Sequence, residues 1–323
     1  MSEKVVVSLG EIMLRLKSPG FERLMQNSIL EATFGGSESN VAISVANYGG
    51  QSRFVTALPK NTVGNAVIAN LRSFNVDTGT IIRQGDRLGI YFVETGSGPR
   101  GSMVIYDRAN SSIATAKSSD FNWDLTFKDA SWFHISGITP AISQNGAEVT
   151  ATAISEARKR KIKVSLDLNY RKNLWKYGKK ATEIMPELMP NVNLVIANEE
   201  DVQDSLGLHI DQKIGGVALD REKYQELAKK VCDVHPSVEM VAITLRESFS
   251  ADHNDWSGML YVKVEGKAYF SKKYSLMDIV DRVGGGDSFA GGLIYGLTSG
   301  MTPPEALERS EERRVGKECR SRW

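Results

Sequence analysis

Residues 281–289 read Asp-Arg-Val-Gly-Gly-Gly-Asp-Ser-Phe, and the rest of the chain is organised around this stretch. The glycines Gly284, Gly285 and Gly286 allow a ligand close to the backbone, and a helix beginning there would offer N–H groups and a positive dipole end to an anion. A carboxylate beside an anion site repels the anion that the site attracts, so the presence of Asp287 there requires an explanation. It is either the base for a hydroxyl that attacks a phosphate, or the helix N-cap. The stretch alone leaves both open.

The composition is that of an ordinary globular protein. The chain has 323 residues with 41% hydrophobic and 24% charged residues, which is enough apolar surface for a full core. A net charge of +1 argues against nucleic acid or an anionic membrane surface as a partner. Two cysteines and four histidines without ligand spacing argue against a disulfide framework or a metal cluster. No signal peptide or membrane-spanning run is seen, so a reduced, cytoplasmic setting is expected.

Strands and helices are predicted to alternate along most of the chain. Short β-branched runs at 5–9, 54–58, 132–138, 162–168, 194–197 and 240–245 predict strands. Helical patterns lie between them, and Ser37 or Ser39 is a candidate cap for the first. This alternation of strands and helices predicts a parallel sheet with helices on both faces. Residues 11–32 and the runs 88–95 and 103–109 are predicted to form strands outside that sheet.

The loop at residues 96–101 reads Gly-Ser-Gly-Pro-Arg-Gly and matches the dinucleotide pattern G-x-G-x-x-G. A strand follows it rather than a helix, so no helix N-terminus is available for a pyrophosphate. We therefore interpret it as a hairpin loop.

Polar residues follow three of the predicted strands. Asn169 and Arg171 follow the strand at 162–168, Asn198 to Asp201 follow the strand at 194–197, and Arg246 follows the strand at 240–245. Ligands of parallel sheets bind beyond the carboxyl ends of the strands, so these residues predict a site. The alternative is that loops are polar in general. No Walker A loop is present, which favours phosphoryl transfer by another design.

Residues 281–287 resemble the second signature of the ribokinase-like (PfkB) carbohydrate kinases, usually D-T-x-G-A-G-D. The segment Gly35-Gly36 to Asn40 resembles their first, sugar-contacting signature. The similarity runs in the family's order from Val5 to about Glu308. It departs from the pattern at 282, where Arg replaces Thr, and at 285, where Gly replaces Ala.

This resemblance implies a ribokinase-like α/β fold: a mostly parallel central sheet with helices on both faces, plus a small β-sheet lid. Residues 1–10, 34–87 and 116–308 would form the core, and 11–33 and 88–115 the lid. In relatives the lid closes over the sugar, which would expel water. It often pairs with a second lid, so a homo-oligomer is expected. The lid's apolar residues would face the core or that partner: Ile90, Phe92, Val104 and Ile105.

Within the family the chain is most similar to 2-keto-3-deoxygluconate kinases. Residues 167–175 match their D-x-N-x-R-x-x-L-W element, and residues 106–108 match their Tyr…Arg element. Tyr91 fits the sugar-facing tyrosine of the lid. Arg108 and Arg171 could pair with a substrate carboxylate, whereas the alternative is that both form surface salt bridges.

The resemblance also implies roles for the other residues. Asp287 would take the hydroxyl proton, while the N–H groups of the triglycine hold the charge on the phosphoryl oxygens. ATP and Mg²⁺ would be required, with Mg²⁺ held through water by Asn198 and either Glu200 or Asp201, because the family's N-x-x-E reads Asn-Glu-Glu-Asp here. The nucleotide would contact Asn198, Arg246 and Arg282. The sugar would contact Gly35, Gly36, Asn40, Tyr91, Tyr106, Arg108, Asn169 and Arg171.

The resulting expectation is an ATP-dependent kinase for the 6-hydroxyl of 2-keto-3-deoxygluconate, a small sugar acid. The alternatives are a kinase for fructose or another sugar, and a non-catalytic sugar-binding regulator. Residues 309–323 carry no amphipathic stripe, and relatives continue differently there. We interpret this tail as foreign sequence that packs poorly and weakens ATP binding, against the alternative of a natural charged tail.

Overall fold

The computed structural model describes residues 4–209, 221–250, 253–277, 279, 281 and 283–318, with side chains up to Glu311 in the last segment. Arg282 and the last five residues lie outside this part, so the predictions made for them are not addressed. Among the described residues, no helix combines the length and apolarity needed to cross a bilayer.

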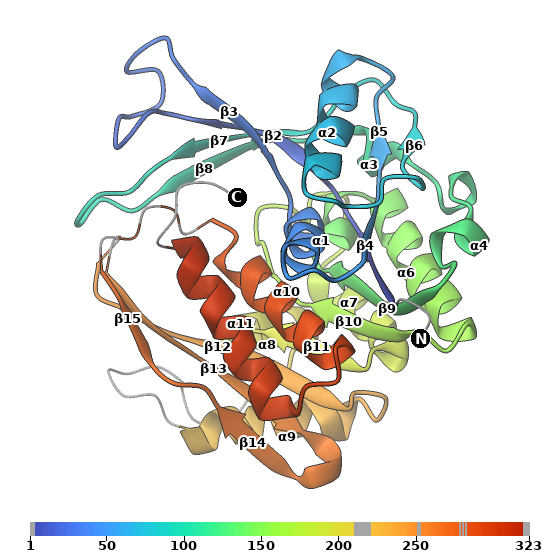
Figure 1. Cartoon of the computed structure of the whole chain (residues 1–323), viewed down its shortest axis with the longest axis vertical. Coiled ribbons are helices and arrows are strands. Elements are labelled where there is room, and N and C mark those ends of the chain that lie inside the picture. The colour runs from blue at the N-terminus through green and yellow to red at the C-terminus, as the bar shows by residue number, and fades with distance from the viewer. Residues whose placement is uncertain are drawn as a thin grey trace.

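A nine-stranded sheet forms the centre of the described part of the chain (Figure 1). The strand order is β14-β13-β12-β11-β10-β9-β1-β4, with β15 paired to β13. The strands from β12 to β4 are mutually parallel, and β13, β14 and β15 are antiparallel additions. This confirms the predicted parallel sheet. The bounds are β1 (Val5–Leu9), β4 (Ser52–Val55), β9 (Ala130–Ser136), β10 (Lys163–Asp167), β11 (Leu194–Ala197), β12 (Met240–Ser248), β13 (Asn254–Val262), β14 (Lys267–Phe270) and β15 (Tyr274–Leu276).

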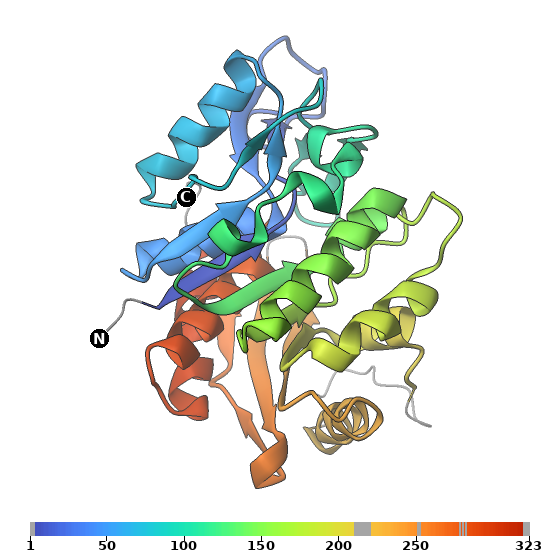
Figure 2. The same cartoon turned by 90° about the vertical axis from the view of Figure 1, so that its right-hand side faces the viewer.

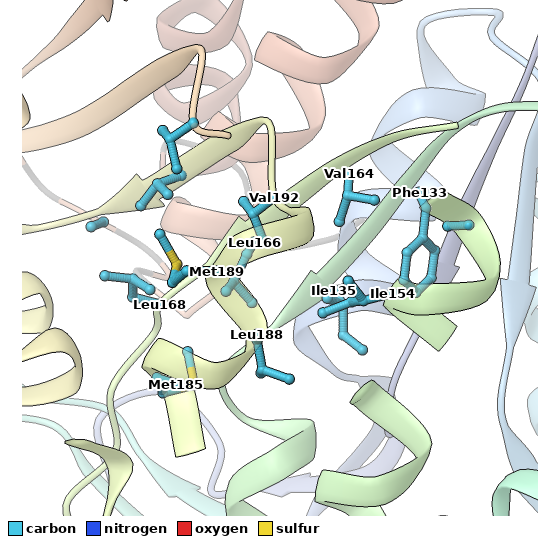
Figure 3. Packing of buried hydrophobic residues seen from close by; sticks show 14 of the residues in the cluster. Phe133, Ile135, Ile154, Val164, Leu166, Leu168, Met185, Leu188, Met189 and Val192 are labelled. Atoms are coloured by element: carbon cyan, nitrogen blue, oxygen red, sulfur yellow. The ribbon is translucent and has the colours of Figure 1, made fainter. Parts of the chain in front are cut away.

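Helices cover both faces of this sheet because successive strand residues point to opposite sides (Figure 2). Val5 and Val7 pack with one group of helices, and Val6 packs with the other. The first group is α6 (Gln144–Lys159), α7 (Ala181–Leu188), α8 (Glu199–Leu206) and α9 (Arg221–Val234). The second is α1 (Ser37–Asn47), α10 (Gly285–Thr298) and α11 (Pro303–Glu318). Figure 3 shows the first core, where Ile154 of α6 and Met185 of α7 pack near strand residues such as Leu166.

Glycines let α10 approach its neighbours closely. A Cβ on Gly291 would lie 2.5 Å from Ser44 Cβ of α1, and one on Gly292 would lie 2.7 Å from Ser310 Cα of α11. The small-residue run after the triglycine is therefore a packing requirement that lets the middle of α10 lie against the C-terminal half of α1.

A separate four-stranded sheet has the order β3-β2-β7-β8 (Figure 1). It comprises β2 (Met13–Lys17), β3 (Glu31–Gly35), β7 (Ile90–Glu94) and β8 (Met103–Asp107). Antiparallel pairing of β7 with β8 confirms the hairpin interpretation of the loop between them. Ile90 and Phe92 are half-buried, whereas Val104 and Ile105 are exposed. The expectation that Val104 and Ile105 face the core is therefore wrong for a single chain, and a partner lid stays a prediction.

The remaining elements connect these layers. They include α2 (Thr62–Ser73), α3 (Ser112–Thr115), α4 (Trp123–Thr126), α5 (Thr139–Ile142) and a small sheet of β5 (Ala57–Leu58) and β6 (Ile82–Arg83).

Three local expectations were wrong. Helix α1 has Gly36 as its N-cap without a side-chain cap, so neither Ser37 nor Ser39 caps it. Arg246 lies within β12 rather than after it, because antiparallel pairing with β13 extends the strand. Ser310 and Glu311 are fully buried in α11, so poor packing does not hold for them. The foreign origin of the tail stays a prediction.

Candidate active site

Asp287 lies in the first turn of α10 and is 9% exposed. Gly284 precedes the helix with a φ of 87°, a left-handed conformation that glycine adopts without strain. Gly284, and not Asp287, is thus the N-cap residue, which rules out the capping interpretation. Gly286 is exposed, and a Cβ added to it would meet no atom within 4 Å. The structure therefore has open space at this helix start, where the helix dipole favours an anion.

Both carboxylate oxygens of Asp287 accept hydrogen bonds from the first turn of α1. Ser37 Oγ donates to Oδ1 over 2.8 Å, and Asn40 Nδ2 donates to Oδ2 over 2.7 Å. Asn169 Nδ2 donates to Ser37 Oγ over 3.2 Å. Asn40, Asn169 and Asp287, separate in the sequence, are thus brought together as predicted. Ser37 was missed as a site residue, because a serine at a predicted helix start is normally interpreted as a cap.

Two more buried carboxylates, Asp167 and Asp201, lie beside this cluster. Asp167 is the last residue of β10, and its side chain accepts a hydrogen bond from the Asn169 N–H over 3.1 Å. Burial, and then repulsion by Asp201 and Asp287, raises the pKa of Asp167 well above its usual range. Burial also raises the pKa of Asp201 to about 6, although Arg171 opposes the shift. Carboxylates whose pKa values are shifted by burial and by one another are concentrated at functional sites.

The predicted magnesium residues lie at the start of α8. Asn198 and Asp201 form a capping box, in which the Asn198 side chain accepts from the Asp201 N–H over 2.7 Å. Asp201 also accepts from the Tyr170 N–H over 3.0 Å. Glu200 is exposed. No group of three or more His, Cys, Asp or Glu side chains among the described residues forms a metal cage. Hard oxygen donors of this kind fit an ion that keeps its water shell, as Mg²⁺ does.

The glycine pair before α1 is required by close contacts. A Cβ on Gly35 would lie 2.6 Å from the hydroxyl of Tyr91, and one on Gly36 would lie 1.9 Å from the Glu11 carbonyl oxygen. Tyr91 is buried on β7, and its ring centroid is 6.2 Å from that of Tyr106 on β8. Burial raises the pKa of Tyr91, so its phenol stays neutral. The small sheet thus places two tyrosines beside the predicted sugar-contacting glycines.

The two arginines predicted to bind a carboxylate differ in their surroundings. Arg108 is buried and forms an ion pair with Glu11, with Nη2 to Oε2 at 2.5 Å, so the surface salt-bridge alternative is wrong for it. Its guanidinium also lies 5.4 Å from the Tyr106 ring centroid. Arg171 is exposed, donates to the Tyr170 carbonyl over 3.1 Å, and acts electrostatically on Asp167. Glu11 was not anticipated, although its position two residues after the end of β1 would have suggested it.

An ion pair that sequence reasoning missed joins the small sheet to the triglycine stretch. Arg15 Nη1 of β2 lies 2.7 Å from Asp281 Oδ2, and Asp281 Oδ1 accepts from the Val283 N–H over 3.0 Å. An arginine inside the apolar strand Met13–Lys17 was the available signal. Arg246 is exposed on β12, with its guanidinium 5.6 Å from the Trp256 ring centroid, and interacts with Glu199.

Comparisons with known proteins agree with this arrangement. A family model described as pfkB family carbohydrate kinase matches residues 3–312. A crystal structure of 2-dehydro-3-deoxygluconokinase from Thermotoga maritima is 41% identical, with a TM-score of 0.92 over 99% of this chain and 95% of that one. The ribokinase-like fold predicted above is thereby confirmed.

Two relatives of known name cover nearly the whole chain. The 2-dehydro-3-deoxygalactonokinase of Haloferax volcanii is 30% identical over 94% of this chain and 87% of its own. The 5-dehydro-2-deoxygluconokinase of Geobacillus thermodenitrificans is 25% identical over 94% of this chain and 83% of its own. The chain therefore belongs to the pfkB family of carbohydrate kinases.

Proposed function

We propose that this protein is an ATP-dependent kinase that phosphorylates the 6-hydroxyl of 2-keto-3-deoxygluconate. The observation that carries the proposal is the Asp287 carboxylate, which is held by Ser37 and Asn40 beside the start of α10. A base and an anion site at the same place suit phosphoryl transfer to a hydroxyl. The family implies the use of ATP, and similar proteins bear the names of kinases for 2-keto-3-deoxy sugar acids.

In the proposed reaction the sugar hydroxyl oxygen attacks the γ-phosphorus of ATP. A new O–P bond forms while the bond between the γ-phosphorus and the β–γ bridging oxygen breaks, so ADP leaves with that electron pair. The hydroxyl proton passes to the Asp287 carboxylate. The N–H groups of Gly284, Gly285 and Gly286 stabilise the charge on the phosphoryl oxygens. Gly35, Gly36, Asn40 and Asn169 orient the sugar.

Mg²⁺ would neutralise phosphate charge when bound. Asn198, Glu200 and Asp201 would hold it through water. Burial raises the pKa of Asp201 because it disfavours the charged carboxylate. A cation bound nearby would stabilise that charge and lower the pKa again. Arg246 interacts electrostatically with Glu199 at the start of α8 and would contact the nucleotide phosphates, as would Arg282.

The substrate's carboxylate is assigned to Arg171 together with Arg108. Arg171 is exposed in the segment that follows β10, two residues after Asn169, and an exposed guanidinium can form a bidentate pair with a carboxylate. Arg108 is already paired with Glu11, which offsets its charge. That pairing is the observation that favours the second candidate, a kinase for fructose or another sugar.

The decisive experiment measures coupled ADP release on a panel of sugars with the wild type and Asp287→Asn. We expect 2-keto-3-deoxygluconate to have the highest kcat/KM, and the variant to lose about 10²–10⁴-fold in kcat. Asp204→Asn, at an exposed position on α8, is the matched control and keeps full turnover. Unchanged turnover in Asp287→Asn would refute the base assignment. Preference for a neutral sugar would establish the second candidate, and no turnover with any sugar would point to a regulator.

A further inference from the structure

The Ser37 hydroxyl lies between the Asp287 carboxylate and the Asn169 amide. Asn169 Nδ2 donates to Ser37 Oγ over 3.2 Å, and Ser37 Oγ donates to Asp287 Oδ1 over 2.8 Å. An amide N–H can only donate, so the Asn169 bond occupies a lone pair of the hydroxyl and turns its hydrogen toward Asp287. The direction of the Ser37 hydroxyl is therefore set by Asn169, which lies just after the end of β10.

The two oxygens of Asp287 differ in their surroundings. The bond from Ser37 to Oδ1 is buried, and Ser37 is only 8% exposed. The bond from Asn40 to Oδ2 is only partly buried. The bond from Ser37 is therefore the more shielded of the two, and it holds one oxygen of the carboxylate in place.

We propose that Ser37 is a positioning residue that anchors Oδ1 of Asp287 and thereby fixes the orientation in which the carboxylate accepts the substrate proton. This rests on the proposed function. Helix α1 has no side-chain cap, and Ser37 contacts the base instead of the helix backbone. The chain thus uses the first turn of α1 to orient a carboxylate on α10.

Charged neighbours make this anchoring measurable. Asp167 on β10 and Asp287 repel each other when both are ionised, and the Tyr91 phenol on β7 is neutral. The donors Ser37 and Asn40 on α1 favour the charged carboxylate. Without Ser37 the charged carboxylate loses one hydrogen-bond donor, so proton binding by Asp287 becomes easier. The acid limb of the pH profile must then move to higher pH.

The test compares Ser37→Ala, Ser37→Thr and the matched control Ser39→Ala. Ser39 is fully buried in the same turn, but its hydroxyl donates to the Gly36 carbonyl over 2.9 Å rather than to Asp287. For Ser37→Ala we expect a loss in kcat of about tenfold, KM values within about twofold, and an acid limb of kcat/KM about one pH unit higher. Ser37→Thr keeps the hydroxyl and restores the profile. Ser39→Ala keeps the wild-type profile.

A second measurement does not require turnover. The carboxyl carbon of Asp287 is titrated by ¹³C NMR in the wild type, in Ser37→Ala and in Ser39→Ala. A midpoint that rises in Ser37→Ala alone supports the anchoring even if no sugar is phosphorylated, in which case the proposed function fails and the role of Ser37 survives. The same midpoint in all three proteins, or an equal shift in both serine variants, overturns it.

Discussion

Replacing Glu38 by Gln should make this protein's stability less sensitive to pH. Glu38 follows Ser37 in α1 and is 1% exposed. Its Oε1 accepts from the Ser136 N–H over 3.0 Å, from Ser136 Oγ over 2.7 Å and from Thr139 Oγ1 over 2.9 Å. Its Oε2 lies against the backbone of Gly10, where an added Cβ would be 2.1 Å away. Three donors favour the charged form, but burial outweighs them.

Burial raises the pKa of Glu38 from an ordinary 4.5 to about 7. The folded state therefore binds this proton more tightly than the unfolded state. The resulting stability is fully present below pH 4.5 and is lost as pH rises through about 7. At about 1.4 kcal/mol per pKa unit, the whole loss is about 3.4 kcal/mol, of which about 2.5 kcal/mol falls between about pH 5 and pH 8.

The assay is urea unfolding of the wild type and Glu38→Gln at about pH 5 and pH 8. The amide does not titrate, so any packing cost of the substitution is the same at both pH values and cancels. We expect the variant to gain about 2.5 kcal/mol relative to the wild type on going from the lower to the higher pH. Glu187→Gln, at an exposed position on α7, is the control. Its unfolding free energy relative to the wild type should change by less than about 0.5 kcal/mol between the two pH values. A Glu38→Gln change no larger than this control would refute the burial argument.

Three further changes test other parts of the site. Gly36→Ala would place a Cβ 1.9 Å from the Glu11 carbonyl oxygen, so we expect a loss of about 2 kcal/mol or more in unfolding free energy, measured by thermal unfolding; a wild-type Tm would contradict this contact. Arg15→Met removes a buried partner of Asp281 and should cost about 3–5 kcal/mol, with part recovered by adding Asp281→Asn; no recovery would mean that the pair itself is not the cause. Arg171→Ala should raise KM for the keto-acid about tenfold or more and leave a neutral sugar unaffected, as measured by ADP release; equal effects on both would remove its role in carboxylate binding.

Most of the fold could be predicted because its signals are local. The run Val5–Leu9 is rich in β-branched residues and is followed by a glycine. In the structure it is a parallel strand that contributes side chains to the hydrophobic cores on both faces of the sheet. Strand-by-strand alternation with helices then leaves few arrangements for the sheet. Helix α8 was missed because eight residues with three acids at the start carry little apolar periodicity.

The site could be predicted in part for a physical reason. Carboxyl ends of parallel strands meet at one edge, so Asn169 could be placed near Asp287 without coordinates. Arg246 departed from this rule, because an antiparallel partner strand continued β12 past the expected end.

The sequence alone therefore determined the layered α/β core, the small sheet and the triglycine turn with its aspartate, since each depends on residues that are neighbours in the chain. Only the tertiary structure decided which side chains hold the charged groups. Ser37 and Asp287 are 250 positions apart, Arg15 and Asp281 are 266 apart, and Arg108 and Glu11 are 97 apart. Such contacts depend on how α1, α10 and the small sheet pack against one another, and no local pattern of residues records that packing.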